Sequence, residues 1–115
     1  MPVELVIKKS RFVGYVVDIE EFESWLAKLK KKHKKAKHIA WAFRYREHGV
    51  LREKFSDDGE PSGTAGRPIL RVMQQRGIVD RAVFVVRYFG GVKLGAGGLV
   101  RAYTKVASMV LDEVV

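Results

Sequence analysis

A glycine-rich stretch, flanked by a wholly apolar run and a helical pattern, constrains the fold of this chain more than any other feature. Residues 82–86 are apolar at every position, as in a strand that is buried on both faces. Five glycines then fall within residues 90–98. From Leu99 to Val114 apolar residues recur at helical spacing. The sequence therefore predicts a strand, a tight glycine loop and a helix, with the helix packed on the sheet and with Tyr88 and Phe89 in the core.

The glycine loop has two interpretations. Backbone N–H groups that no Cβ shields, at the positive end of a helix dipole, suit a bound anion. Alternatively, the glycines only allow a turn that packs closely against the sheet. The candidate ligand-contacting residues of this region are Arg87, Lys93, Arg101 and five glycines: Gly90, Gly91, Gly95, Gly97 and Gly98.

The length and composition narrow the class of protein. A chain of 115 residues with 47% hydrophobic content supports one core, so we expect a single domain over residues 1–115. No segment approaches the roughly 20 apolar residues of a membrane span, and the first residues lack a signal-peptide pattern, so we expect a cytoplasmic protein. The absence of cysteine excludes disulfides and thiolate metal sites. The absence of asparagine and the presence of only two glutamines indicate a thermophilic source.

Most of the net charge of +9 comes from a lysine-rich window at residues 28–37. An apolar stripe ahead of it predicts a helix of about residues 20–34, with Asp18 as its N-cap. Lysines at a helix C-terminus are favoured by the dipole and can simply be solvated. Alternatively they contact the phosphate backbone of RNA, although no aromatic residue is interleaved with them for base stacking. The candidate nucleic-acid patch consists of Lys28, Lys31, Lys32, Lys34, Lys35 and Lys37.

The remaining strands follow from alternation. Residues 5–7 and 10–17 predict a first strand with a break at residues 8–9. Residues 38–46 alternate between a bulky face and a small face that carries Ala40 and Ala42, so the small face is expected to be closely approached or to line a shallow site. A turn at residues 47–49 leads to a more polar strand at residues 50–55. His38 is a candidate site residue, either hydrogen-bonded to a neighbour or acting as a general base.

Residues 56–68 form an unusual loop with three acids, three glycines and two prolines. Its acidic residues Asp57, Asp58 and Glu60 have the oxygens that Mg²⁺ prefers, but their spacing is not that of a calcium loop. We favour a rigid, exposed recognition loop over a metal site, with a turn at residues 57–59 and Glu60 paired with Arg67, and we expect no metal and no cofactor. Ser62 or Thr64 is expected to cap the following helix.

The acidic loop and the glycine loop are expected to form one polar cleft. Each follows a strand and precedes a helix, and helices that leave neighbouring parallel strands begin at the same edge of a sheet. We therefore predict that Arg87, between the loops, lies within about 4 Å of a carboxylate of the acidic loop, with Asp57 or Asp58 as its expected partner. The cleft residues are His38, Thr64, the three acids and the glycine-loop residues named above.

Four segments together resemble the N-terminal domain of the Impact family, which includes bacterial YigZ-type proteins and eukaryotic Impact. They are Lys9-Ser10-Arg11-Phe12, His38 with the strand after it, residues 56–68 and residues 86–103. The resemblance implies an α+β, two-layer fold like domain 2 of ribosomal protein S5, with helices on one face of a four-stranded sheet. Bacterial members carry a second, ferredoxin-like domain, and this chain is expected to be a single-domain version without it.

The resemblance implies a non-catalytic regulatory module in translational control, with a protein or ribosome-associated partner and no membrane partner. Eukaryotic members bind the ribosome-associated activator of the amino-acid-starvation kinase. Two alternatives stay open: RNA binding by residues 28–37, and a phosphate-handling enzyme that uses the glycine loop with His38, Asp57, Asp58 and Arg87. No nucleophile and base stand at a recognisable spacing, so no catalytic residue is assigned. No oligomeric state is predicted.

Overall fold

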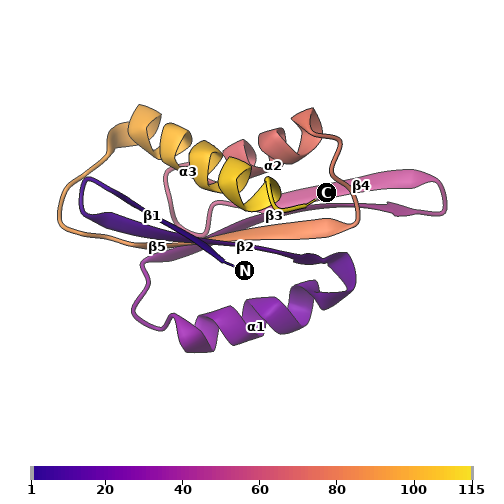
Figure 1. Cartoon of the computed structure of the whole chain (residues 1–115), viewed down its shortest axis with the longest axis horizontal. Helices are drawn as coiled ribbons and strands as arrows, with labels where there is room; N and C mark the ends of the chain where they lie inside the picture. Colours follow the sequence, from indigo (N-terminus) through magenta and orange to yellow (C-terminus); the bar gives the residue numbers. More distant parts are fainter. Residues whose placement is uncertain (1, 115) are drawn as a thin grey trace.

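The computed structural model describes residues 2–114, which form a five-stranded sheet and three α-helices (Figure 1). The strands are β1 (Val3–Ile7), β2 (Ser10–Asp18), β3 (His38–Glu47), β4 (Val50–Ser56) and β5 (Arg81–Tyr88). The helices are α1 (Phe22–Lys32), α2 (Gly66–Gln75) and α3 (Gly95–Leu111), and a 3₁₀ turn at Ile19–Glu21 precedes α1. Within the described residues, no helix combines the length and the apolar character that crossing a membrane requires.

The strand order is β1-β2-β5-β3-β4, and every neighbouring pair is antiparallel. β5 therefore lies at the centre, although it is the last strand in the sequence. Its residues 82–87 are all buried, which confirms the prediction that the apolar run is a strand covered on both faces. The prediction that the last helix packs on the sheet is also confirmed, since its residues Tyr103, Val106 and Leu111 lie in the core and are each at most 1% exposed.

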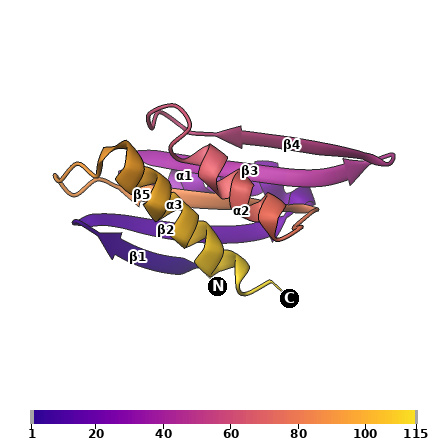
Figure 2. The same cartoon turned by 90° about the horizontal axis from the view of Figure 1, so that it is seen from above.

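The predicted α+β class is confirmed, with two differences from the expected arrangement. The sheet has five strands because the break at residues 8–9 is a hairpin, with φ of 46° at Lys8 and 70° at Lys9, as a two-residue turn requires. The helices cover both faces rather than one. Figures 1 and 2 show α2 and α3 on one side of the sheet and α1 on the other.

Two apolar cores explain why both faces need a helix. Under α2 and α3 the sheet contributes small and medium side chains, among them Ala40, Ala42 and Val85. Under α1 it contributes aromatic and branched side chains, including Phe84 and Val86. Because neighbouring residues of β5 point to opposite faces, one strand supplies both cores. The small face predicted for β3 is confirmed, and α2 is the element that approaches it.

The two special loops lie at the same end of the sheet. β4 and β5 are not neighbours, because β3 lies between them. Both are antiparallel to β3, so they run in the same direction and finish at the same end of the sheet (Figure 2). The two loops meet as predicted, although β4 and β5 are not adjacent, because both strands pair with β3 between them.

Candidate functional site

The centre of the candidate site is a buried carboxylate, Glu60, held by a guanidinium and a phenol. Arg87 donates from Nε to Oε2 at 2.6 Å and from Nη2 to Oε1 at 2.8 Å. The hydroxyl of Tyr103 donates to Oε2 at 2.5 Å. This is the two-pronged arginine–carboxylate geometry that fixes both direction and distance.

The structure confirms that Arg87 meets a carboxylate of the acidic loop, but it changes the partners. The partner is Glu60 and not Asp57 or Asp58. The expected pairing of Glu60 with Arg67 is wrong, because the Arg67 guanidinium lies over the ring of Phe55, 5.1 Å from its centroid.

The register of the sheet explains why these residues meet. Arg87 stands opposite Phe12 on β2 and opposite His38 on β3, so the three side chains share the face covered by α2 and α3. The hydroxyl of Ser10, two residues before Phe12, accepts a hydrogen bond from Nη1 of Arg87 at 3.1 Å. Tyr103 reaches down from α3 and contacts the ring of Phe12 edge to face, with 5.4 Å between centroids.

His38, on β3, contacts two residues of the acidic loop, Asp58 and Glu60, one through each ring nitrogen. Its Nδ1 lies 2.7 Å from the carbonyl oxygen of Asp58, and a carbonyl only accepts, so Nδ1 carries the hydrogen. Its Nε2 lies 3.3 Å from Oε1 of Glu60. A second proton on Nε2 would therefore complete an ion pair with the carboxylate. The role of His38 as a general base stays a hypothesis, beside a hydrogen-bonded position in the strand.

The charges of the cluster stabilise each other. Burial alone would lower the pKa of Arg87, but the hydrogen bonds and charge of Glu60 outweigh it and raise that pKa. Burial, together with the hydrogen bond and charge of Glu60, raises the pKa of Tyr103 well above its usual value. Tyr103 therefore keeps its proton and remains a donor. Within residues 2–114, every buried side-chain nitrogen or oxygen has a hydrogen-bond partner.

The other two acids of the loop accept hydrogen bonds from backbone N–H groups. Asp57 accepts from the N–H groups of Gly63, Ala65 and Gly66 at 2.9, 3.1 and 2.8 Å. It thereby caps α2, and the predicted caps Ser62 and Thr64 are wrong: the Thr64 hydroxyl donates to the carbonyl of Pro61 at 2.6 Å.

Asp58 accepts from the N–H of Ile39 at 2.7 Å, so the three carboxylates of the loop serve three different sets of donors. In the part of the chain that the structure describes, no three metal-ligating side chains gather at one point.

A pocket of about 290 Å³ opens beside the Glu60–Arg87 pair. The loop after β5 lines it with Lys93, Leu94 and Gly95. Phe89, which also lines it, is 45% exposed, so the prediction that Phe89 is a core residue is wrong. Its ring packs over the Arg87 guanidinium, with 5.6 Å from centroid to Cζ.

The predicted glycine-loop residues divide between packing and two separate pockets. A Cβ on Gly90 would lie 2.0 Å from the carbonyl oxygen of Lys9, so this glycine allows the β1–β2 hairpin to approach. Gly91 and Gly95 have φ of 90° and 75°, values that favour glycine. Arg101 and Gly98 line a neighbouring pocket and not the one beside Glu60.

The lysine window lies on the other face of the sheet. Lys28, Lys31 and Lys32 are on α1, and the remaining three lysines of the patch follow it toward β3. All six are exposed. The two sets of candidate residues are therefore separate in space.

Sequence reasoning missed several polar residues of both faces. Tyr103 was expected only as part of an apolar stripe, and the need of a buried phenol for a partner was the available signal. On the α1 face, buried His33 bridges two tyrosines: its Nε2 lies 2.9 Å from the hydroxyl of Tyr15, and its Nδ1 contacts the hydroxyl of Tyr88. Arg87 and Tyr88, adjacent on β5, thus serve polar clusters on opposite faces.

Comparison with known protein families matches residues 8–111 to the Impact N-terminal domain. IMPACT family member YvyE of Bacillus subtilis is 45% identical over 114 residues, which are 96% of this chain and 52% of that protein. IMPACT family member YigZ of Escherichia coli is 39% identical over 109 residues, covering 89% of this chain and 53% of that protein. The chain therefore spans about half the length of the curated relatives it matches.

Two solved structures share the fold. A crystal structure described only as that of a hypothetical protein superposes with a TM-score of 0.88 at 34% identity, covering 97% of this chain and 56% of that one. The two-domain translational regulator Yih1 superposes with a TM-score of 0.56 at 23% identity, covering 96% of this chain and 44% of that one.

Proposed function

The chain belongs to the Impact N-terminal domain family, and from this premise we propose that it is a non-catalytic binding module in translational control. Yih1, a protein of the same fold, is described as a translational regulator, and the proposal carries that role to this chain. The expected partner is a protein, free or associated with the ribosome.

The observation that carries the proposal is an exposed apolar loop fixed on a fully paired polar cluster. Glu60, Arg87 and Tyr103 engage each other inside the protein, which suits them to hold the loop in place. Phe89 and Val92 remain 45% and 37% exposed on that loop. Apolar side chains that are exposed beside a pocket offer a protein partner surface to bury.

The charge of the residues around this pocket indicates the charge of the expected partner. Lys93 lines the same pocket, and Lys8, Arg101 and Lys105 line the neighbouring one. We therefore expect an acidic segment with an apolar side chain that enters beside Phe89. The phosphate-handling alternative needs Arg87 for an anion, and Arg87 is already paired with Glu60, so we do not propose it.

The proposal is tested by sedimentation of the chain with ribosomes and with ribosome-depleted extract, with and without nuclease. We expect the chain to associate with a protein in these samples, and Phe89→Ser to weaken that association severalfold. In the ribosome-depleted extract, nuclease should leave the association intact. Val50→Ser is the matched control, because Val50 is 51% exposed at the other end of the sheet. Equal binding by both variants, or no association at all, would contradict the proposal.

A further inference from the structure

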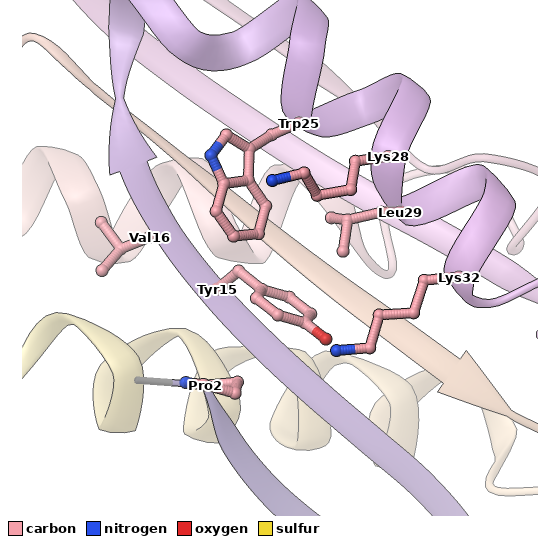
Figure 3. A pocket seen from close by; sticks show the side chains of 7 residues that line it. All are labelled: Pro2, Tyr15, Val16, Trp25, Lys28, Leu29 and Lys32. Atoms are coloured by element: carbon pink, nitrogen blue, oxygen red, sulfur yellow. The ribbon is translucent and has the colours of Figure 1, made fainter.

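A second pocket, of about 370 Å³, lies between α1 and β2 on the face of the sheet opposite Glu60 (Figure 3). Its lining combines two aromatic rings, Tyr15 and Trp25, with two ammonium groups, those of Lys28 and Lys32. Pro2 and Val16 add aliphatic surface. The volume falls within the roughly 300–1,000 Å³ of small-molecule sites.

The two rings form an angled wall that the sequence pattern does not reveal. Trp25 comes from α1 and Tyr15 from β2, with 5.7 Å between ring centroids and 48° between ring planes. Nζ of Lys28 lies 4.5 Å from the centroid of the Trp25 ring. The ammonium group of Lys28 thus covers the face of the Trp25 indole. When the Lys28 side chain rotates to bind an anion, a flat ring can stack on the indole in its place.

The two charged side chains that line this pocket, Lys28 and Lys32, are both positive. Lys28 and Lys32 are four residues apart, so they stand one above the other on the helix, and Figure 3 shows both beside the rings. No acidic residue occurs between Ser24 and Arg46. Burial, together with the charges of Lys32 and Arg11, lowers the pKa of neighbouring His33, which keeps that residue a neutral link between Tyr15 and Tyr88.

We propose that this pocket binds one unpaired nucleotide of a single-stranded nucleic acid, with its base against Trp25 and its phosphates on Lys28 and Lys32. Aromatic stacking beside a cationic track is how proteins hold single strands without reading their sequence. The track continues past the pocket through Lys34 and Lys35, which gives a strand contacts that a free nucleotide lacks. This site is independent of the proposed protein partner, which uses the opposite face.

The test compares two pairs of lysines on one helix. Binding of labelled oligoadenylate RNA is measured by fluorescence anisotropy at low salt, for Lys28→Gln/Lys32→Gln and for Lys30→Gln/Lys31→Gln. Both variants remove the same charge from α1, but only the first pair lines the pocket. We expect the first pair to weaken binding several times more than the second. Equal losses would overturn the proposal, because they would describe a solvated cationic helix end.

The contribution of the base is isolated by Trp25→Leu and by a probe without bases. We expect Trp25→Leu to weaken oligoadenylate about tenfold and to leave inorganic polyphosphate unchanged. Trp25→Phe keeps a ring and should retain most of the affinity, which separates stacking from misfolding. Parallel titrations with deoxyoligoadenylate and with AMP distinguish the sources of the nucleotide. Three results would each overturn the proposal: AMP binding as tightly as the oligomers, an unchanged affinity of Trp25→Leu for oligoadenylate, or no binding of oligoadenylate by the wild type.

Discussion

At the scale of single residues, Glu60 joins four parts of the chain. The carboxylate sits in the acidic loop, while Arg87 comes from β5, Tyr103 from α3 and His38 from β3. A buried charge is costly unless it is paired and hydrogen-bonded, and here both oxygens of Glu60 are engaged. Removing the charge of Glu60 or of Arg87 leaves the other charge buried without a partner. The resulting loss of unfolding free energy therefore exceeds the stability that the pair itself contributes.

We therefore expect Glu60→Gln, which keeps the shape and removes the charge, to lower the unfolding free energy by about 3–5 kcal/mol. The measurement is urea denaturation followed by circular dichroism. Glu47→Gln is the control: Glu47 pairs with Arg52 at the surface, where both side chains are more than half exposed, and its loss should stay below about 1 kcal/mol. Similar losses for the two variants would contradict the assignment of Glu60 as a buried charge.

His33 predicts a pH dependence on the other face. Burial, then Lys32 and Arg11, lower its pKa below the usual 6.5. As pH falls, the unfolded chain takes up this proton first, so the stabilising contribution is complete above about pH 6.5 and is lost as pH falls through the lowered value. We expect His33→Gln to reduce the slope of unfolding free energy against pH below 6.5. The exposed His48→Gln should leave that slope as it is, and an equal effect of both would refute the prediction.

At the scale of elements, the start of α2 depends on a residue well before it in the sequence. Asp57 caps the helix through three backbone N–H groups, although α2 begins at Gly66. This ties the acidic loop and the helix into one unit. The loop holds Glu60 beside Arg87 because Asp57 binds the backbone at the start of α2 and Asp58 binds the backbone of β3 at Ile39.

Asp57→Ala should cost about 2 kcal/mol, the upper end of the range for lost caps, because one carboxylate serves three donors. Asp57→Asn keeps one oxygen acceptor and should cost less. Both are measured by thermal and chemical denaturation. Ser62→Ala is expected to change the unfolding free energy by less than about 0.5 kcal/mol, and a larger effect than that of Asp57→Ala would mean that Ser62 is the cap after all.

At the scale of the whole molecule, three layers share one central strand. α1 packs on one face, α2 and α3 on the other, and β5 contributes to both cores (Figure 1). Two cores that share a strand cannot lose their packing independently. We therefore expect the described part of the chain to unfold in one transition.

Leu29→Ala on α1 and Leu111→Ala on α3 test this coupling, since both side chains are at most 1% exposed. Each should lower the unfolding free energy by about 2–5 kcal/mol, with transitions by tryptophan fluorescence and by circular dichroism that coincide. A separate early transition in Leu29→Ala would show that α1 detaches alone and that the sheet has only one obligatory helical layer.

Local patterns in the sequence were sufficient to predict several helices, strands and turns. The apolar run of β5, the helical spacing of α3, the small face of β3 and the turn at residues 47–49 each follow from side-chain periodicity or turn chemistry within a few residues. The glycine and acidic loops could likewise be recognised as family features, because they are contiguous in the chain.

The tertiary structure alone decided which residues meet. In the sheet β5 lies between β2 and β3. Because of this strand order, Arg87 contacts Glu60, and Tyr103 of α3 contacts the same carboxylate. The strand order also turns α1 to the opposite face, where Trp25 joins Tyr15. Contacts between residues tens of positions apart depend on strand order and register, which minimise the free energy of the whole sheet. No periodicity within a single segment encodes them.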